Sequence, residues 1–279
     1  MIAELSLPLL PEADLERRFG GLRRLYADVG YARVRAARVA VVGLGGVGSW
    51  ACEALARSGV AALTLIDLDH IAESNINRQV QATGATLGQA KALALRERIA
   101  DIHPGCVVTV VEAFVDEGNW PGLLSQPVDV LIDACDQVRA KAALAAWSLH
   151  TGTPVVSVGA AGGKRRPQAV QVSDLAQVTH DPLLASVRQR LRKQHAGPRD
   201  GAMGVRCVHS LEPVIAPQVD ACAAKSDGTD TAGGSRDSSL NCHGYGSSVC
   251  VTATFGLVAA NEALEFVVAL ARDTPAKPI

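Results

Sequence analysis

Glycines and polar residues in the first third of the chain have the types and spacing of a phosphate-binding site. The segment Gly43-Leu44-Gly45-Gly46-Val47-Gly48 follows an apolar run at 39–42 and opens a helical pattern at 47–58. Glycines at such a turn let backbone N–H groups and the positive end of a helix dipole contact phosphates. Asp67 ends the next apolar run, where an acidic side chain can hold ribose hydroxyl groups. The pattern predicts a nucleotide site and leaves ATP and NAD both open.

Two cations that follow Asp67 favour ATP. Arg78, in Ser74-Asn75-Ile76-Asn77-Arg78-Gln79, carries a rigid fork of donors that can grip a triphosphate and neutralise the charge of a leaving pyrophosphate. Lys91, in Gly88-Gln89-Ala90-Lys91, can add a compact cation to the same phosphates. Either side chain alone could be a solvated surface charge, but their order after the glycine turn and Asp67-Leu68-Asp69 argues against that. We therefore expect nucleotidyl transfer rather than hydride transfer.

A later strand end offers a carboxylate for a metal ion. Asp133-Ala134-Cys135-Asp136 closes an apolar run at 128–134. A carboxylate at this edge could hold Mg²⁺ against phosphate oxygens, and the metal would polarise the α-phosphate. Asp133 could instead cap the following loop or helix. We assign the metal to Asp136 because it lies farther out from the strand.

The alternation of apolar runs with helical patterns defines the elements that must position these residues. It predicts a doubly wound α/β fold, a Rossmann-like and mainly parallel sheet with helices on both faces and its site at the carboxyl ends of the strands. A C-terminal extension follows this domain. The predicted strands are 39–42, 62–67, 107–111, 128–134, 154–158 and 168–172, and the predicted helices are 47–58, 88–102, 139–151 and 182–194.

The domain organisation follows from changes in composition along the chain. We expect an N-terminal tail at 1–16, a nucleotide-binding domain at 17–175 and an extension of the same domain at 176–279. Within the extension, residues 220–245 are mostly Ser, Gly, Thr, Asp and Ala without periodicity, which predicts a flexible loop.

The composition also narrows the class of protein. Lys and Arg total 27 against 28 Asp and Glu, so any nucleic-acid surface must be local. The seven cysteines contain no Cys-x-x-Cys pair, which argues against structural zinc and a disulfide framework. The apolar segment 247–271 contains Asn261, Glu262 and Glu265, which favours a core or dimer-interface helix over a membrane span. A reducing, cytoplasmic setting fits these features.

The five motifs, taken in order, resemble the adenylating domain of the ubiquitin-activating-enzyme superfamily over positions 17–175. In that superfamily a carboxylate attacks the α-phosphate of ATP, which gives an acyl-adenylate and pyrophosphate. The resemblance implies ATP and Mg²⁺ as cofactors, with catalysis by Arg78, Lys91 and Asp136 and the magnesium on Asp136. The nucleotide contacts that it implies are Gly43, Gly45, Gly46, Gly48, Asp67 for the ribose, Asp69, Asn75, Arg78, Gln79 and Lys91.

Further segments resemble one branch of this superfamily, the tRNA threonylcarbamoyladenosine dehydratases, and extend the likeness nearly end to end. This branch implies adenylation of the carboxylate of threonylcarbamoyladenosine next to the tRNA anticodon. The carbamoyl nitrogen of the modification then closes a ring and AMP leaves, so no protein nucleophile is needed. The segments are Arg18-Phe19-Gly20-Gly21, Arg24-Leu25-Tyr26, Val47–Trp50, Arg139–Leu144, Gly159–Gly163, Asp181-Pro182-Leu183 and Val251–Gly256.

Two other functions stay open at this point. Relatives that activate the C-terminal glycine of small sulfur-carrier proteins usually carry two Cys-x-x-Cys zinc pairs, which this sequence lacks. An NAD-dependent oxidoreductase or a nucleotide-sensing protein is disfavoured by Arg78, Lys91 and Asp136. The superfamily also has an N-terminal arginine that acts in trans. Gly21 stands at that position here, so Arg23 or Arg24 would have to replace it.

The partners expected are tRNA, a second copy of the chain through 247–271, and a sulfur-relay or cysteine-desulfurase-type protein. The last depends on Cys207, whose thiol beside Arg206 and His209 could have a lowered pKa. A half-buried packing cysteine is the favoured alternative. For the tRNA backbone we expect a local basic surface, although a solvated helix face explains its second part equally well. Its residues are Lys164, Arg165, Arg166, Arg188, Arg190, Arg192 and Lys193.

Overall fold

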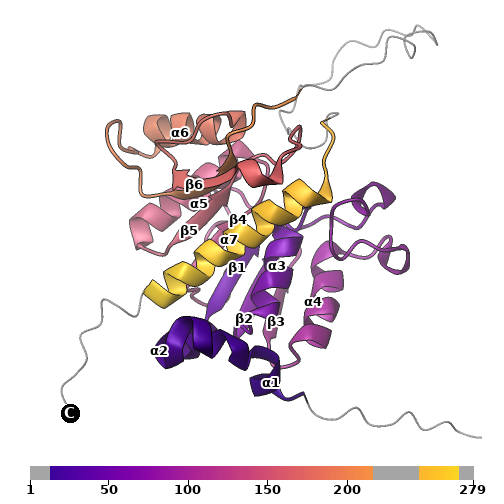
Figure 1. Ribbon diagram of the computed structural model, residues 1–279. Coiled ribbons are helices and arrows are strands. Elements are labelled where there is room, and N and C mark those ends of the chain that lie inside the picture. The colour runs from indigo at the N-terminus through magenta and orange to yellow at the C-terminus, as the bar shows by residue number, and fades with distance from the viewer. Residues whose placement is uncertain (1–12, 216–244, 270–279) are drawn as a thin grey trace, which may run out of the picture.

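The computed structural model describes residues 13–215 and 245–269. Within these residues, seven strands form one sheet in the order β3-β2-β1-β4-β5-β7-β6, with helices on both faces (Figure 1). The expected flexible loop at 220–245 lies outside the described residues except for Tyr245. The strands are β1 (Arg38–Val42), β2 (Ala62–Ile66), β3 (Val107–Val111), β4 (Val130–Asp133), β5 (Val155–Val158), β6 (Val170–Asp174) and β7 (Arg206–Ser210).

The parallel strands confirm the doubly wound α/β fold. Strand β1 pairs in parallel with β2 on one side and with β4 on the other, so the winding reverses between β1 and β4. In the register, Val42 lies opposite Ile66 and Asp133, which places the carboxyl ends of three strands at one level. A reversal of this kind opens a crevice at the carboxyl ends of the strands. All predicted strands of the series are found within one or two residues at each end.

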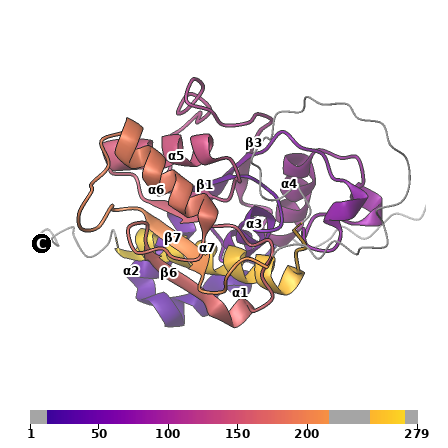
Figure 2. The same ribbon diagram turned by 90° about the horizontal axis from the view of Figure 1, so that it is seen from above.

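The helices cover the two faces because alternate strand residues point to opposite sides. Val39 and Val41 pack into a core with α3, α4 and α7, whereas Ala40 and Val42 pack into a second core with α5 and α6. Figure 2 shows α5 and α6 on the face away from α2 and α7. The α-helices are α1 (Leu15–Phe19), α2 (Arg23–Ala36), α3 (Gly48–Arg57), α4 (Lys91–Ile102), α5 (Val138–Thr151), α6 (Pro182–Gln194) and α7 (Val249–Ala269). Short 3-10 helices are η1 (Gly20–Leu22), η2 (Glu73–Asn75), η3 (Gly84–Thr86) and η4 (Pro167–Ala169).

The C-terminal part of the chain enlarges the same sheet. Strand β7 pairs in parallel with β5 and antiparallel with β6, so it lies between two strands that precede it in the sequence. The predicted strand at 168–172 begins two residues late, because Pro167–Ala169 form η4. Strand β7 and helices α1 and α2 were not predicted as elements.

Helix α7 is the helix expected at 247–271. It is long and apolar enough to cross a membrane by length and composition, but half of its most apolar window is buried inside the protein. Gly256 brings it against the start of α3, since a Cβ at this position would clash with the backbone oxygen of Val47. Glu262 forms an ion pair with Arg206 at 3.0 Å, so the carboxylate that this apolar helix carries has a charged partner. The packing supports a core helix.

Candidate functional site

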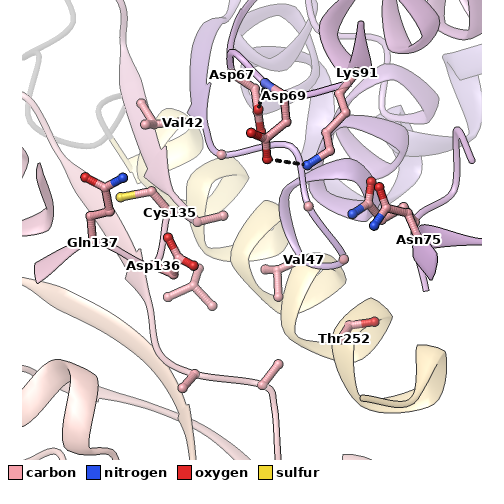
Figure 3. Close-up of a pocket in the computed structure, with 18 of the residues that line it drawn as sticks. Val42, Val47, Asp67, Asp69, Asn75, Lys91, Cys135, Asp136, Gln137 and Thr252 are labelled. Carbon is pink, nitrogen blue, oxygen red and sulfur yellow. Dashed lines mark hydrogen bonds and ion pairs between the residues drawn. The ribbon is translucent and has the colours of Figure 1, made fainter. Parts of the chain in front are cut away.

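A cavity of about 330 Å³ lies at the carboxyl ends of the central strands, at the reversal between β1 and β4. Ten of the eleven residues predicted for the nucleotide and the metal line it, and Figure 3 shows several of them facing the same space. Gly48 is the exception. The residues that line it are Gly43, Gly45, Gly46, Asp67, Asp69, Asn75, Arg78, Gln79, Lys91 and Asp136.

The glycine turn is shaped by close approaches of the backbone. Gly43 has φ of +84°, and a Cβ there would lie 2.8 Å from the backbone of Ala134 after β4. A Cβ at Gly48 would clash with the backbone oxygen of Gly43, so this glycine permits the tight return into α3. The fingerprint therefore contains two kinds of glycine. Gly48 serves packing, while Gly43, Gly45 and Gly46 also line the cavity.

Asp67 fixes the turn to the end of β2. Its Oδ2 accepts a hydrogen bond from the backbone N–H of Leu44 at 2.6 Å, and its Oδ1 accepts one from that of Asp69 at 2.8 Å. Burial raises the pKa of the Asp67 carboxyl, and the charge of Lys91 and these two donors oppose the effect only in part. A carboxylate has further lone pairs on both oxygens, so Asp67 can still accept hydrogen bonds from a ligand.

Lys91 begins α4 and is held at the cavity wall by Asp69. Its Nζ lies 2.7 Å from Asp69 Oδ2, and this pair is drawn as the dashed line in Figure 3. The backbone N–H of Lys91 also donates to the backbone oxygen of Asp69 at 3.0 Å. The Lys91 side chain is 8% exposed and that of Asp69 is 51% exposed. The ammonium is therefore nearly buried but keeps a face on the cavity.

Arg78 is held by its own segment. Its guanidinium donates to the backbone oxygen of Ser74 at 2.7 Å and to Asn77 Oδ1 at 2.9 Å. Gly46 leaves room for the stem of Arg78, because a Cβ there would lie 3.1 Å from Arg78 Cγ. Asn75 is buried, and its Oδ1 accepts from the backbone N–H of Ala72 at 3.0 Å, which closes the 3-10 turn η2. These local bonds shape the cationic wall.

The two aspartates after β4 differ in role. Asp136 lines the cavity in the loop that follows the strand (Figure 3), whereas Asp133 is fully buried. Asp133 accepts from Ser157 Oγ at 2.7 Å and pairs with Lys141 at 3.1 Å, so it is not free to bind a metal. It also accepts the backbone N–H of Cys135 at 3.3 Å, in agreement with the alternative that it caps the loop.

No group of three or more His, Cys, Asp or Glu side chains that could hold a metal occurs in the described parts of the chain. A Mg²⁺ ion in nucleotide enzymes is commonly held by one or two carboxylates together with substrate phosphates. Asp136 alone, open to the cavity, fits that donor set, provided that phosphates supply further ligands.

A second wall of the cavity was not predicted as a site. It consists of the loop at 159–162 after β5, Leu183 on α6, and Ser247 and Thr252 at the start of α7. The loop is held from behind, because Asp181 Oδ2 accepts the backbone N–H of Ala160 at 2.9 Å. The loop reaches the cavity because β5 pairs in parallel with β4, which places the carboxyl ends of these two strands side by side.

Gly163 joins three segments at the edge of this wall. Its backbone N–H donates to the backbone oxygen of Gly246 at 2.9 Å, and its own oxygen accepts from the N–H of Ile215 at 2.8 Å. Its φ is +70°, and a Cβ there would lie 2.8 Å from Val214 Cγ1. The position therefore requires glycine.

The basic surface is smaller than expected. Lys164 is 2% exposed, and its Nζ donates to the backbone oxygens of Glu212 at 2.8 Å and His180 at 3.3 Å, so its inclusion was wrong. A buried ammonium that bonds main-chain oxygens cannot also reach a phosphate outside. Burial lowers the pKa of Lys164. Arg188 likewise donates inward, to the backbone oxygens of Leu175 and Val178.

The other basic side chains stay nearer the surface. Arg190 forms an ion pair with Glu117 at 3.0 Å, and Arg192 donates to the backbone oxygens of Pro198 and Arg199. The side chains left exposed are those of Arg165, Arg166 and Lys193.

Two further candidates lie away from the cavity. Cys207 is fully buried in β7, and burial raises the pKa of its thiol well above the ordinary value. This supports the packing interpretation, because a reactive cysteine needs a lowered pKa and access. Arg23 at the start of α2 pairs with Glu16 and Asp28 at 3.2 and 2.8 Å. Among the described residues that line the cavity, neither Arg23 nor Arg24 occurs.

Comparisons with known proteins agree with this geometry. The model of the ThiF family matches residues 20–278. The tRNA threonylcarbamoyladenosine dehydratase of Escherichia coli (strain K12) is 44% identical over 260 residues, which is 91% of this chain and 95% of that protein. Two crystal structures of the E. coli enzyme are also similar. The complex with ATP has a TM-score of 0.81 at 40% identity and covers 94% of this chain and 99% of that chain. The complex with AMP has a TM-score of 0.82 at 40% identity, and the match covers 95% of this chain and 100% of that chain.

Proposed function

The chain belongs to the ThiF family and, within it, to the tRNA threonylcarbamoyladenosine dehydratases, and from this membership we propose its activity. The enzyme dehydrates threonylcarbamoyladenosine next to the anticodon of tRNA, with ATP as co-substrate. The observation that carries the proposal is the gathering of Arg78, Lys91 and Asp136 around the glycine turn in a single cavity.

The reaction has two steps that balance without a protein nucleophile. First, a carboxylate oxygen of the substrate attacks the α-phosphorus of ATP, and the bond to pyrophosphate breaks. Next, the carbamoyl nitrogen attacks the adenylated carbonyl carbon, and the bond to AMP breaks. The proton of that nitrogen passes to solvent. One oxygen of the carboxylate leaves with AMP, so the nucleoside has lost the elements of water.

The cavity residues take roles that suit these steps. The backbone N–H groups of the glycine turn and of the start of α3 donate hydrogen bonds to phosphate oxygens. Asp67 holds the ribose, with Asp69 and Gln79 supporting the wall around it. Asn75, Arg78 and Lys91 bind the phosphates, and the two cations stabilise the charge that develops on pyrophosphate. Both cations already have fixed partners in the free protein, so little reorganisation is required when ATP binds.

Asp136 is the residue that would hold Mg²⁺. The ion, when bound, supplies charge that polarises the α-phosphate. Asp136 lines the same cavity as the cationic residues and the loop at 159–162.

The second wall receives the carboxylate of the modified adenosine. The loop at 159–162 consists of glycine and alanine, so its small side chains leave space in the cavity for the substrate. Thr252 and Ser247 add polar groups to the lining beside the cationic segment, since Asn77 donates to the backbone oxygen of Ser247 at 3.2 Å. Arg165, Arg166 and Lys193 are the exposed cations that would contact the tRNA backbone.

The assembly proposed is a homodimer. Leu25 on α2 is 71% exposed and Val29, beyond a kink at Ala27, is 63% exposed, while Leu257 on the adjacent α7 is 49% exposed. Apolar side chains this exposed are common at subunit interfaces. Arg23 or Arg24, which begin α2, would then lie close to the partner. The buried Cys207 offers no accessible thiol, so a sulfur relay does not form part of the proposal. We propose a cytoplasmic location for the enzyme, in keeping with its tRNA substrate.

One assay tests the activity. The purified protein is incubated with ATP, Mg²⁺ and one of three substrates: tRNA with threonylcarbamoyladenosine, the same tRNA without the modification, or small carrier proteins. We expect release of AMP and pyrophosphate only with the modified tRNA, together with a nucleoside lighter by one water. Release with a carrier protein alone would favour the sulfur-carrier alternative. Release of AMP without any acceptor, or no release at all, would refute adenylation of the modified tRNA and of the carrier protein alike.

A further inference from the structure

Lys141 on α5 is a fully buried lysine that none of the roles above uses. Its side chain has no exposed surface, and it is one of the largest side chains buried to this degree. Its Nζ donates to the backbone oxygen of Val158 at 2.6 Å and to that of Asp133 at 3.2 Å, and lies 3.1 Å from Asp133 Oδ2. These three acceptors match the three N–H donors of an ammonium group.

The ion pair is supported on both sides. Asp133 also accepts from Ser157 Oγ on β5 and from Cys135 Sγ at 3.0 Å. Burial lowers the pKa of Lys141, but the charge of Asp133, its hydrogen bond and the nearby cysteines together outweigh this effect, so the pKa lies above its ordinary value. The lysine is therefore charged. Buried ion pairs of this kind can often be replaced by apolar residues without loss of stability, so stability alone does not explain the pair.

The two backbone acceptors of Lys141 have special places in the fold. Asp133 is the last residue of β4 and Val158 is the last residue of β5. The chain that leaves β4 carries Asp136, and the chain that leaves β5 forms the loop at 159–162. One ammonium group thus joins the starting points of two loops that leave neighbouring strands and both line the cavity.

We propose that Lys141 is a positioning residue for adenylation: it sets the spacing between the loop that carries Asp136 and the loop at 159–162. The inference rests on the proposed function, in which Asp136 acts at the α-phosphate and the loop at 159–162 receives the attacking carboxylate. Nucleophilic attack requires reacting atoms about 3–3.5 Å apart, and a displacement of about 1 Å can cost about 100-fold in rate. The nucleotide contacts on β1, β2 and α4 do not depend on this link.

The test separates positioning from stability by removing both charges together. Lys141→Met alone leaves Asp133 buried and unpaired, so we expect a lower Tm. The double variant Asp133→Asn/Lys141→Met contains no unpaired charge, and we expect its Tm to return close to that of the wild type. Its Kd for a fluorescent ATP analogue should stay within about threefold, whereas kcat for AMP release with modified tRNA should fall by about 30-fold to 100-fold.

A matched control removes a second ion pair, which is only partly buried. Arg206→Met/Glu262→Gln alters a pair between the amino end of β7 and α7, far from the carboxyl ends of the strands. We expect kcat to be unchanged in this control. Hydrogen exchange should rise in the loops at 134–137 and 159–162 in the Lys141 double variant but not in the control.

Recovery of kcat together with Tm in the double variant would overturn the proposal, because a structural role alone predicts that result. If the double variant does not fold, the single variant Lys141→Arg tests the positioning role instead. Its guanidinium keeps the charge but cannot occupy the place of one ammonium among three oxygens. We expect a folded enzyme with normal ATP affinity and kcat lower by about tenfold. An unaltered kcat would refute positioning, while absence of AMP release by the wild-type enzyme would refute the proposed function instead.

Discussion

Lys91 Nζ lies 2.7 Å from Asp69 Oδ2, and the backbone groups of the same two residues are also hydrogen-bonded, at 3.0 Å. The pair thus joins the end of β2 to the start of α4 twice. The first bond fixes the ammonium and the second fixes the helix that carries it. Because Asp69 is half exposed and Lys91 is nearly buried, the carboxylate can move into solvent while the cation stays at the wall.

Loss of the Lys91 charge should weaken ATP binding more than it weakens the fold. A hydrogen bond to a charged group contributes about 1.5–3 kcal/mol, so Lys91→Met should raise the Kd for ATP by about tenfold to 100-fold. Fluorescence titration with an ATP analogue measures this change, and thermal denaturation monitors the fold. Asp69→Asn, which keeps the cation, is the matched variant and should have a smaller effect. Equal effects of the two substitutions would contradict a direct contact between Lys91 and phosphate.

Arg78→Ala and Asp136→Ala should abolish AMP formation while both variants stay folded. Arg78 bonds its own segment, and Asp136 has no partner among the described residues on which the core depends. Removal of a group that stabilises transition-state charge typically costs about 100-fold to 1,000-fold in kcat. Circular dichroism and AMP release measured on the same samples test this. Near-normal turnover in either variant would show that its assignment is wrong.

Gly43→Ala should destabilise the protein much more than Gly45→Ala. A Cβ at Gly43 would meet the backbone of Ala134 at 2.8 Å in a conformation with φ of +84°, whereas nothing lies within 4 Å of a Cβ at Gly45. The left-handed conformation alone costs about 1–2 kcal/mol for a residue with a Cβ. We expect a drop in Tm of several degrees for Gly43→Ala and almost none for Gly45→Ala. Similar Tm values for the two variants would contradict the geometry of the turn.

Glu53 on α3 should contribute stability that is lost in acid. Burial alone would raise its pKa, but hydrogen bonds from Arg98 and Arg57 outweigh this effect, so the pKa is lowered in the folded protein. A carboxyl with a lowered folded pKa contributes stability above its unfolded pKa of 4.5 and loses it as the pH falls through the folded value.

Chemical denaturation tests this sign. Glu53→Gln should be less stable than the wild type at pH 7, and the difference should shrink as the pH falls below 4.5. Arg57→Gln, which removes the more exposed partner, should show a smaller difference at pH 7 because Arg98 still bonds both carboxylate oxygens. A difference between wild type and Glu53→Gln that stays constant with pH would refute the role of this carboxylate.

The exposed arginines should affect tRNA and not ATP. Replacement of Arg165 and Arg166 by serine should raise the KM for modified tRNA and reduce the slope of log Kd against log salt by about one for each phosphate that the enzyme no longer binds. The Kd for ATP should not change. Arg96→Ser, on the exposed side of α4, controls for removal of surface charge in general. An equal rise in KM for the control would exclude a specific tRNA surface at Arg165 and Arg166.

The sequence predicted the parts of the fold and of the site that depend on local pattern. The glycine turn, Asp67, Arg78 and Lys91 are close together in the sequence. Their order and spacing were therefore sufficient to predict that they line one site. Strand β7 was not among the predicted strands, and its polar residues His209 and Ser210 are buried in the structure. The partners of Lys141 and Lys164 are largely main-chain oxygens distant in the sequence, and composition gives no sign of them. The second wall of the cavity therefore depends on contacts between residues that are distant in the sequence.

The two hydrogen bonds of Gly163 hold together two points that are distant in the sequence. Ile215 and Gly246 are both bonded to the backbone of this residue. Ser247, which follows Gly246, lines the cavity. A substitution at Gly163 would therefore disturb the attachment of Ser247 together with the loop that precedes Gly163.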